Sequence, residues 1–436
     1  MAIDGSILII VFALFLGTLA LGVPITVSAG IAALSAWFMI PGFPASPGFV
    51  FRNMVAVLDS TPFLAIPLFI LSGNLMAKGG ISGRLFDLFS YFVGNKTGGL
   101  PAAVIVTTFF YGSFTGSAPA TVAAVGAMTI PLLVSLGYNK VFVTAMVVVP
   151  SGLAIILPPS VPMIVFGMSS GTSIGDLFIA GILPGILVAA VMVIYVVLYF
   201  KIRGGEDKEK LNENFNKLRS KGFFKVFKDS ILALLCPFII LGGIYSGIVT
   251  PTEAANISVV YALILSVLVY RTISLKELPE IFKDSASTTA KVFVIISTAT
   301  VLGRVLTLMQ APQQISAALM GMFYSDVATF IVILLFLITF GLFMEPLAVI
   351  IITTPIFFPI VTGMGINPVH FGVLMIFCSA IGFVTPPVGM SLFVATSITK
   401  IPLLSIAKQT VQFLVLLAIV MVVIILVPEI SLILLR

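Results

Sequence analysis

Charge is scarce in this chain of 436 residues: Asp, Glu, Lys and Arg together make up 9% of it, whereas hydrophobic residues make up 60%. A soluble domain could not bury so much apolar surface. The long apolar runs are also unbroken, without the alternation of apolar and polar residues that a membrane β-barrel requires. The composition therefore predicts an all-α, polytopic membrane protein.

Residues used for catalysis and metal binding are equally rare. The single histidine, His370, and the two cysteines, Cys236 and Cys378, give no basis for a disulfide framework or for a His- or Cys-based metal site. The sequence has no phosphate-binding GxxxxGK(S/T) loop and no HExxH motif, so we expect neither an ATP-driven motor in this chain nor an enzyme. We interpret the net charge of +6 as a sign of membrane topology and not of nucleic-acid binding.

Candidate membrane spans occur in two series of five. The first is expected near 5–20, 23–40, 62–78, 141–168 and 176–200, and the second near 231–248, 253–270, 292–310, 370–398 and 407–427. Prolines interrupt the fourth member of each series. Before it lies a further apolar region, 101–136 or 327–362, which is rich in Gly, Pro, Ser and Thr around its middle. The N-terminus has no basic n-region, so we expect it to remain as the first span.

The basic residues indicate that these two further regions are re-entrant hairpins. The linker 201–229 holds nine Lys and Arg residues and is assigned to the cytoplasm. If both hairpins enter and leave on one side, 19 of the 22 basic residues become cytoplasmic, with Arg52 and Arg436 outside and Arg304 within a span. Full crossings would scatter the basic loops to both sides. Both termini are then expected on the periplasmic side.

One constant shift along the chain relates the two series, and we call it the repeat offset. It pairs Pro131 with Pro359, Gly137 with Gly365, Asn139 with Asn367, Ser151 with Ser379, and Pro158-Pro159 with Pro386-Pro387. Five crossings per half is an odd number, so the halves 1–200 and 230–436, joined by the linker 201–229, are expected to be inverted repeats. Inverted repeats with interrupted helices at corresponding positions are typical of secondary transporters.

Four polar segments, 110–123, 149–162, 340–350 and 379–390, are the candidates for binding. A break at membrane depth frees carbonyl oxygens that suit Na⁺, and half-helix N-termini favour a substrate carboxylate. We expect one cation site to use Ser113, Gly116, Ser117, Pro150, Ser151 and Gly152, and its counterpart to use Gly341, Met344, Glu345, Ser379, Ala380, Gly382 and Thr385. The residues expected at the substrate are Ser117, Ala118, Pro158, Pro159, Arg304, Glu345, Pro386 and Pro387. The alternative is that these Gly, Ser and Pro residues only mark packed helix interfaces.

Two charged residues in apolar surroundings allow several roles. Arg304 could attract an anionic substrate, extend to the membrane surface or pair with Glu345. Glu345 could be a cation ligand, a proton carrier or the partner of that arginine. We expect His370 to be a surface residue at a helix start, and Asp59 and Glu253 to cap the spans that follow them.

Two shorter segments, 48–55 and 274–285, mix charged and apolar residues at helical spacing. They are expected to be amphipathic helices that lie along the membrane and brace a fixed scaffold. The linker 201–229 is either a similar helix or a solvated tether.

The motifs resemble those of one transporter family. PIFFPIVTGMGINPVHFGVLMIFCSAIGFVTPPVGMSLFV (355–394), FILSGNLMAKGGISGRL (69–85) and YSGIVTPTEAA (245–255) are similar to the large membrane (M) subunit of TRAP transporters, the tripartite ATP-independent periplasmic family. The likeness covers nearly the whole chain. One departure is that Leu157 stands where the second repeat has Thr385, so the two cation sites are expected to differ in their ligands.

This resemblance implies an elevator-type transporter with a fixed scaffold and a mobile domain of two hairpins and two broken helices. It implies Na⁺-coupled uptake of an organic acid across a bacterial inner membrane, together with a small four-span Q subunit and a soluble periplasmic binding protein. The chain opens with the M-type pattern and is expected to be an unfused M subunit. Sialic acid is the favoured substrate and a C4-dicarboxylate the other candidate. A stand-alone Na⁺/dicarboxylate symporter and a channel stay open as alternatives.

Overall fold

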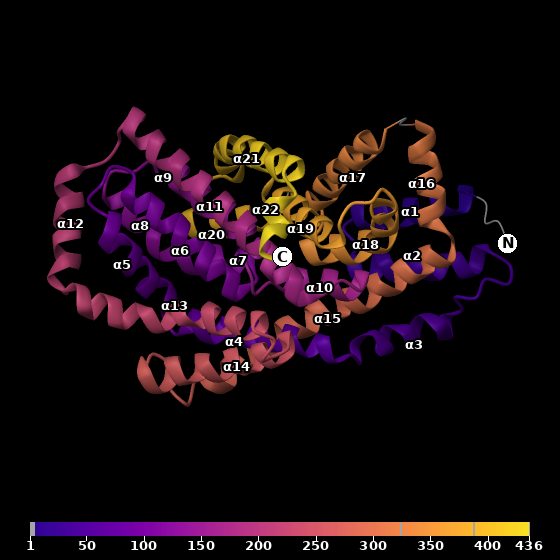
Figure 1. The fold of residues 1–436 in the computed structure, drawn as a ribbon, viewed down its shortest axis with the longest axis horizontal. Coiled ribbons are helices and arrows are strands. Elements are labelled where there is room, and N and C mark those ends of the chain that lie inside the picture. Colours follow the sequence, from indigo (N-terminus) through magenta and orange to yellow (C-terminus); the bar gives the residue numbers. More distant parts are fainter. Residues whose placement is uncertain (1–4, 323–324, 387–388, 436) are drawn as a thin grey trace.

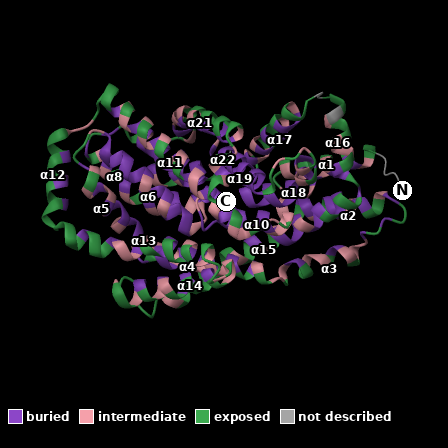
Figure 2. Ribbon diagram, viewed as in Figure 1, coloured by how far each residue is buried: buried purple, intermediate pink, exposed green. Residues whose placement is uncertain are grey.

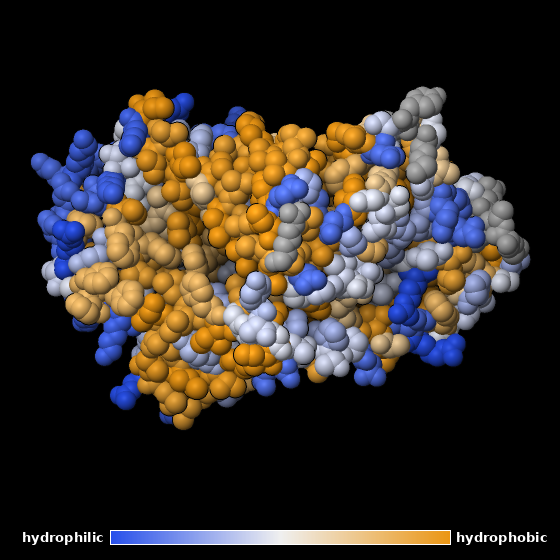
Figure 3. Space-filling model, viewed as in Figure 1, coloured by the Kyte–Doolittle hydropathy of each residue, from blue (hydrophilic) through white to orange (hydrophobic). Residues whose placement is uncertain are grey.

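The fold is entirely helical. The computed structural model describes residues 5–322, 325–386 and 389–435, and no β-strand occurs among them (Figure 1). The predicted all-α architecture is therefore confirmed. In this described part, nine helical stretches are long and apolar enough to cross a membrane. Hydrophobic residues cover broad areas of the face seen in Figure 3, while hydrophilic residues gather at the end that carries α12 (Lys208–Ser220).

The first half runs from α1 to α11 and includes one hairpin and one broken helix. Its elements are α1 (Gly5–Ala20), α2 (Ile25–Met39), α3 (Pro47–Leu58), η1 (Thr61–Leu64), α4 (Ala65–Lys78), α5 (Ile81–Val93), α6 (Gly99–Thr115), α7 (Ala118–Thr121), the π-helical η2 (Val122–Gly126), α8 (Ala127–Ser135), α9 (Lys140–Leu153), η3 (Ala154–Ile156), α10 (Val161–Ser170) and α11 (Ile174–Arg203). The first hairpin consists of α6 and the continuous stretch α7–η2–α8. The first broken helix consists of α9 and α10.

The second half follows the same order. Its elements are α13 (Phe223–Tyr245), α14 (Pro251–Leu263), the π-helical η4 (Ile264–Val269), α15 (Leu278–Leu308), α16 (Ala311–Met322), α17 (Asp326–Gly341), α18 (Pro346–Gly363), α19 (Pro368–Val384), α20 (Met390–Thr399), α21 (Leu403–Leu426), α22 (Glu429–Leu432) and η5 (Ile433–Leu435). The second hairpin is α17 with α18, and the second broken helix is α19 with α20.

The two broken helices begin in the same way, at positions that the repeat offset pairs. Asn139 accepts hydrogen bonds from the N–H groups of Val141 and Phe142, both at 3.0 Å. Asn367 accepts from Val369 at 2.8 Å and from His370 at 3.3 Å. An asparagine that caps the first free N–H groups fixes where a helix starts. The repeated asparagine thus sets equivalent starts for α9 and α19.

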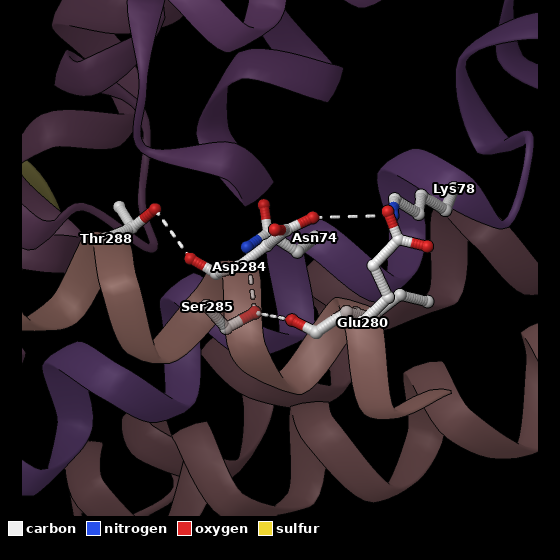
Figure 4. A network of polar contacts seen from close by, with 7 residues as sticks. Asn74, Lys78, Glu280, Asp284, Ser285 and Thr288 are labelled. Carbon is white, nitrogen blue, oxygen red and sulfur yellow. Dashed lines mark hydrogen bonds and ion pairs between the residues drawn. The ribbon is translucent and has the colours of Figure 1, made fainter. Parts of the chain in front are cut away.

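A layer of helices runs along the lower edge of the view in Figure 1, where α3, α4, α13, α14 and α15 lie. Polar contacts join α4 of the first half to α15 of the second (Figure 4). The Asn74 side chain donates to the Ser285 hydroxyl at 2.8 Å, and Lys78 forms ion pairs with Asp284 at 3.4 Å and Glu280 at 4.0 Å. We call this group of five helices, together with α1 and α2, the scaffold layer.

The most deeply buried helices of the described part, α6, α9, α18 and α19, belong to the hairpins and the broken helices. Every residue from Val369 to Val384 in α19 is buried, as is every residue from Phe142 to Leu153 in α9. Figure 2 shows α10 and α19 buried at the centre, whereas α12 at the edge is mostly exposed. We call these hairpins and broken helices the core.

The linker between the halves is attached to the open end of the first hairpin. The Glu206 carboxylate accepts hydrogen bonds from the Gly98 N–H at 2.6 Å and from the Tyr138 hydroxyl at 2.8 Å. The Asp207 N–H donates to the Leu136 carbonyl at 3.0 Å. Gly98 precedes α6, and Leu136 and Tyr138 follow α8, so the linker holds both ends of the hairpin. Burial and the neighbouring Glu206 carboxylate raise the pKa of Tyr138, which keeps its hydroxyl a hydrogen-bond donor.

Several details differ from the sequence-based expectations. The segment 274–285 is not a separate amphipathic helix, because no proline or glycine follows Pro279 until Gly303 and α15 runs unbroken from 278 to 308. His370 starts a helix as expected, but its side chain is buried and not on the surface. Glu253 completes a capping box with Thr250, as expected. Asp59 ends α3 and does not cap the next span.

Two helices, α5 and α16, were not predicted. They are short, and neither is one of the nine span-length helices of the described part. The repeat offset places them at nearly the same position in the two halves. The linker is part helix, since α12 occupies residues 208–220.

Candidate functional site

The tip of the first hairpin is a two-residue turn between its two helical arms. Gly116 has a φ of +59°, which glycine adopts without strain, and Ser117 is extended. The Ser117 hydroxyl caps the second arm by accepting from the Ala120 N–H at 3.4 Å. These two residues therefore turn the chain back and start the helix 118–135.

Hydroxyl groups hold this first tip together. The Thr115 and Thr121 hydroxyls lie 2.8 Å apart, and the Thr121 hydroxyl also donates to the Ser117 carbonyl at 2.9 Å. The sequence-based site did not include Thr115 or Thr121. Their position close to Ser117 in TGSAPAT (115–121) is the sequence feature that could have identified them.

The tip of the second hairpin places a carboxylate at the matching position. Glu345 is the N-cap residue of α18 and the counterpart of Ser117 at the repeat offset, but its side chain makes no capping hydrogen bond. The Glu345 side chain is exposed, whereas its neighbours in the chain, Met344 and Pro346, are buried. The equivalent N-cap positions of the two hairpins thus carry a neutral hydroxyl and a carboxylate.

Each hairpin packs tightly against the broken helix of its own half. A Cβ atom on Gly341 would lie 2.8 Å from the Ser379 carbonyl oxygen and 3.0 Å from the Gly382 Cα. In the first half, a Cβ atom on Gly112 would collide with the Ala154 side chain. Small residues at these contacts let the hairpin backbones reach the breaks.

The two breaks have the same backbone conformation. Leu157 has φ −80° and ψ 132°, and its counterpart Thr385 has φ −85° and ψ 134°. Both residues end a helical turn in an extended conformation. The two broken helices also meet each other, because a Cβ atom on Gly152 would lie 3.8 Å from the carbonyl oxygen of Ala380, its counterpart at the repeat offset.

The second parts of the broken helices pack across the repeats. The half-helix α10 contacts α18 of the second hairpin, and α20 contacts α7 and η2 of the first hairpin. Each hairpin is therefore held by the first half-helix of its own repeat and by the second half-helix of the other. This exchange brings both tips to the centre of the core.

A small cavity of about 30 Å³ lies where the two tips meet. Its lining comes from both tips, from both broken helices and from the starts of three helices, and consists of Gly116, Ser117, Ala118, Pro119, Gly152, Ile155, Pro162, Glu345, Pro346, Leu347 and Phe383. This volume has room for a water molecule or a small cation but not for an organic acid. We call it the tip cavity.

The tip cavity brings together five of the predicted site residues: Gly116, Ser117, Ala118, Gly152 and Glu345. It adds residues that the sequence-based site missed, among them Pro119, Pro162, Pro346 and Leu347. These residues occupy the first turns of the helices 118–135, 161–170 and 346–363. The sequence could have identified them, because each predicted tip or break implies that a helix starts directly after it.

The other predicted residues lie around this cavity or farther away. Four hydroxyls donate to carbonyls of their own helices, at distances between 2.6 and 2.8 Å: Ser113, Ser151, Ser379 and Thr385. Gly341, Ala380 and Gly382 form the close backbone contacts described above. Pro150, Pro158, Pro159 and Met344 are buried, and Pro386 is half-buried. Pro387 lies outside the described residues.

Arg304 belongs to the scaffold layer and does not line the tip cavity. Its guanidinium donates to the Asn53 side chain on α3. Among the described residues, no ion pair joins it to Glu345. The repeat offset places Arg304 between Asn74 and Lys78, which make the polar contacts of α4 with α15. Arg304 thus contributes to the polar contacts between helices of the scaffold layer.

The groups around the tip cavity are of two chemical kinds. Carbonyl and hydroxyl oxygens at the tips and breaks are ligands that suit Na⁺. The first N–H groups of a helix have no partner within that helix, and the partial positive charge at three helix starts favours an anionic group.

Comparisons with known proteins agree with this architecture. The family described as "Tripartite ATP-independent periplasmic transporter, DctM component" matches residues 12–430. The chain is 39% identical to the isethionate TRAP transporter permease protein of Oleidesulfovibrio alaskensis, over 96% of its own length and 64% of that relative's length. It is 38% identical to the C4-dicarboxylate TRAP transporter large permease of Pseudomonas aeruginosa, over 85% of each chain.

Two further comparisons bear on family and fold. The sialic acid TRAP transporter large permease of Vibrio cholerae is 34% identical over 96% of each chain. The crystal structure of the YdaH transporter of Alcanivorax borkumensis covers 86% of this chain and 87% of its own, with a TM-score of 0.61 and 11% identity, which shows a shared fold. On these grounds the chain belongs to the family of TRAP transporter large membrane subunits, the DctM component.

Proposed function

We propose that this protein carries out Na⁺-coupled uptake of an organic acid across the bacterial inner membrane, as the large membrane subunit of a TRAP transporter. The observation that carries the proposal is the tip cavity, where both hairpin tips, both broken helices and three helix starts converge. Oxygen ligands for a cation and N–H donors for a carboxylate occur there side by side. We assign both termini to the periplasm and the linker 201–229 to the cytoplasm.

The mechanism follows from the division into scaffold layer and core. Na⁺ binds at the hairpin tips and breaks, orders them, and completes a carboxylate site between Ser117 and Glu345. Because the tip cavity is smaller than an organic acid, the tips must separate to admit the solute. The loaded core then slides as a body against the scaffold layer, which is an elevator movement.

The partners and the substrate are the finer parts of the proposal. A small four-span membrane subunit and a soluble periplasmic binding protein complete the transporter, in keeping with the tripartite family description. Relatives are named for isethionate, C4-dicarboxylates and sialic acid. Sialic acid stays the proposed substrate, and a C4-dicarboxylate is the other candidate. A stand-alone symporter is the second candidate, and transport without a binding protein would favour it.

Reconstitution in proteoliposomes tests the proposal. The chain is incorporated with the small subunit, the binding protein is added outside, and uptake of labelled sialic acid, isethionate and succinate is measured under an inward Na⁺ gradient. We expect uptake of at least one acid to depend on Na⁺. Equal uptake without Na⁺ under an imposed proton gradient would contradict the coupling, and single-channel currents would contradict a transporter.

Ser117 provides the matching variant test. We expect Ser117→Val to raise the Na⁺ concentration for half-maximal uptake by about fivefold, because the loss of one hydroxyl interaction costs about 1 kcal/mol. The control is Ser135→Val at the exposed open end of the same hairpin. An unchanged Na⁺ requirement in Ser117→Val would show that the cation site is misplaced.

A further inference from the structure

A short run at the end of the linker combines basic and aromatic residues. RSKGFFKVFK (219–228) contains four cationic residues, three phenylalanines and no acidic residue. It covers the end of α12 and the first turns of α13, a helix that is long and apolar enough to cross a membrane. Basic clusters next to a membrane span are attracted to anionic lipids. We call this run the basic segment.

The phenylalanines of the basic segment face outward instead of packing into the protein. Phe224 is 86% exposed, and Phe223 and Phe227 are each 38% exposed. The helix face that Phe224 begins continues along α13 to Leu235 and Phe238, which are also exposed. Exposed aromatic side chains beside lysines are typical of helices at the membrane interface. We therefore expect the basic segment to lie at the level of the lipid headgroups.

A pocket of about 260 Å³ lies beside this segment, between α5 and α13. Its lining consists of Arg84, Asp87, Lys221, Lys225, Val226, Asp229 and Ser230. The volume is smaller than that of a typical site for a whole drug-sized molecule, and it has room for a phosphate group. We call it the α5–α13 pocket.

Three helices give this pocket a fixed shape. Leu88 of α5, Leu218 of α12 and Val226 of α13 are buried together in a small hydrophobic cluster of their own. The Ser230 hydroxyl of α13 donates to the Arg84 carbonyl of α5 at 2.7 Å. Figure 1 shows α5, α12 and α13 together at the end of the molecule opposite the N-terminus. The cationic groups therefore project from a packed junction of helices and not from an isolated tail.

The three cations of the pocket differ in how they are engaged. Lys221 forms a partly exposed ion pair with Asp87 at 2.7 Å. The Arg84 guanidinium lies over the Tyr270 ring, 3.8 Å from its centre. Lys225 forms no ion pair with any residue that the structure describes. An anion in the pocket thus meets one cation without an acidic partner and two more beside it.

The charge balance around the pocket is positive. The basic segment and Arg84 supply five cations against the carboxylates of Asp87 and Asp229, an excess of three. Such an excess favours an anionic ligand over a zwitterionic one. The tendency of cytoplasmic loops to be basic accounts for the number of these cations. It does not account for a pocket between two helices or for the outward-facing phenylalanines beside it.

From this arrangement we infer that the α5–α13 pocket binds the phosphate of an anionic phospholipid of the cytoplasmic leaflet, while the phenylalanines of the basic segment contact its acyl chains. The inference goes beyond the proposed function and takes from it only the assignment of the linker to the cytoplasm. The linker is then held at both ends, by the first hairpin at Glu206 and by the membrane at the basic segment.

Lipid binding to the purified full chain in a neutral detergent tests the inference. Dioleoylphosphatidylglycerol, which is anionic, is compared with dioleoylphosphatidylcholine, which has the same acyl chains and no net charge. Binding is followed by the shift of the thermal unfolding midpoint and by the lipids retained in native mass spectra. We expect phosphatidylglycerol to bind about tenfold more tightly, with an advantage that shrinks at high salt.

Substitution of the two pocket lysines supplies the second arm. Lys221→Gln/Lys225→Gln should weaken phosphatidylglycerol binding about thirtyfold, because each basic residue near an anionic surface contributes about fivefold. The matched control is Lys201→Gln/Lys208→Gln, which removes the same charge near the other end of the linker and should leave the binding nearly unchanged. All four lysines are exposed, so both double variants should keep the unfolding midpoint of the lipid-free protein.

Four results would overturn the inference. Equal binding of the two lipids would exclude recognition of charge, and equal losses in the two double variants would show attraction by overall charge without a site. Inorganic phosphate that raises the midpoint as much as phosphatidylglycerol would make the pocket a site for a free anion. Loss of phosphatidylglycerol binding on addition of the small membrane subunit would assign this surface to a protein contact. Each of these leaves Na⁺-coupled uptake of an organic acid intact.

Discussion

At the scale of single residues, the closest contacts in the core are made by the smallest side chains. Gly382 is the clearest case, because a Cβ atom there would lie 2.6 Å from the Gly341 Cα and would collide with the Ile338 carbonyl. The sequence predicted that Gly341 and Gly382 meet near the second tip. It assigned them to a cation site from their type alone, whereas their packing role depends on how closely α17 and α19 approach, which no sequence pattern records.

Gly382→Ala should therefore destabilise the second hairpin. The added methyl group meets backbone atoms that cannot move aside, and we expect a loss of about 1–3 kcal/mol or a displaced tip. The measurement is the thermal unfolding midpoint of the purified protein, with Na⁺-dependent uptake as a second readout. Gly363→Ala at the end of the same hairpin is the control, since a Cβ atom there would meet nothing within 4 Å. Equal midpoints for the two variants would contradict the tight contact.

At the scale of helices, prolines, glycines and asparagines marked most boundaries correctly. Both hairpins, both breaks and the starts of α9 and α19 follow from such residues. The sequence did not show which helices are continuous. Asp59 and Ser60 separate α3 from η1, which starts at Thr61-Pro62, whereas DSASTTAK (284–291) contains no proline or glycine and lets α15 continue. The helices α5 and α16 escaped because the search was for membrane spans, although the repeat offset relates them.

The two asparagine caps allow a test at this scale. Asn139→Ala and Asn367→Ala should each lower the free energy of unfolding by about 1 kcal/mol, because each asparagine satisfies two otherwise free N–H groups. Ser160→Ala is the contrast: Ser160 is the N-cap residue of α10, but its hydroxyl makes no capping bond and lacks any partner among the described residues. Its loss should leave the unfolding midpoint unchanged or raise it. A larger loss in Ser160→Ala than in the asparagine variants would contradict this account.

At the scale of the whole molecule, the arrangement that matters most could not be read from the sequence. The repeat offset predicted two equivalent units, but the packing of α10 against the second hairpin and of α20 against the first is a long-range exchange between them. Sequence periodicity reports only which face of a helix is apolar, not which partner covers it. The meeting of Ser117 and Glu345 at one cavity follows from that exchange.

An elevator movement predicts that cross-links within the scaffold layer are tolerated and cross-links between layer and core are not. A Cβ atom on Gly303 of α15 would lie 3.7 Å from the Pro355 Cβ of α18, within the range of a disulfide. Oxidised Gly303→Cys/Pro355→Cys should therefore lose transport and regain it on reduction. Asn74→Cys/Ser285→Cys, bridged within the layer by a short thiol reagent, should keep it.

The native cysteines do not interfere with this comparison, because Cys236 and Cys378 are buried and free. Full transport in the oxidised Gly303/Pro355 double variant, with the cross-link verified by mass, would contradict a sliding core. Loss of transport in the Asn74/Ser285 pair would show that the scaffold layer itself must flex.

The attachment of the linker to the first hairpin has a practical consequence. Glu206 holds the residues just outside both arms of that hairpin, so the start of α12 must follow the hairpin wherever it goes. The first arm of the hairpin, α6, is almost wholly buried, whereas α12 presents exposed positions on the surface (Figure 2). A spectroscopic label on an exposed position of α12 therefore reports, during turnover, the displacement of a hairpin arm that is itself buried.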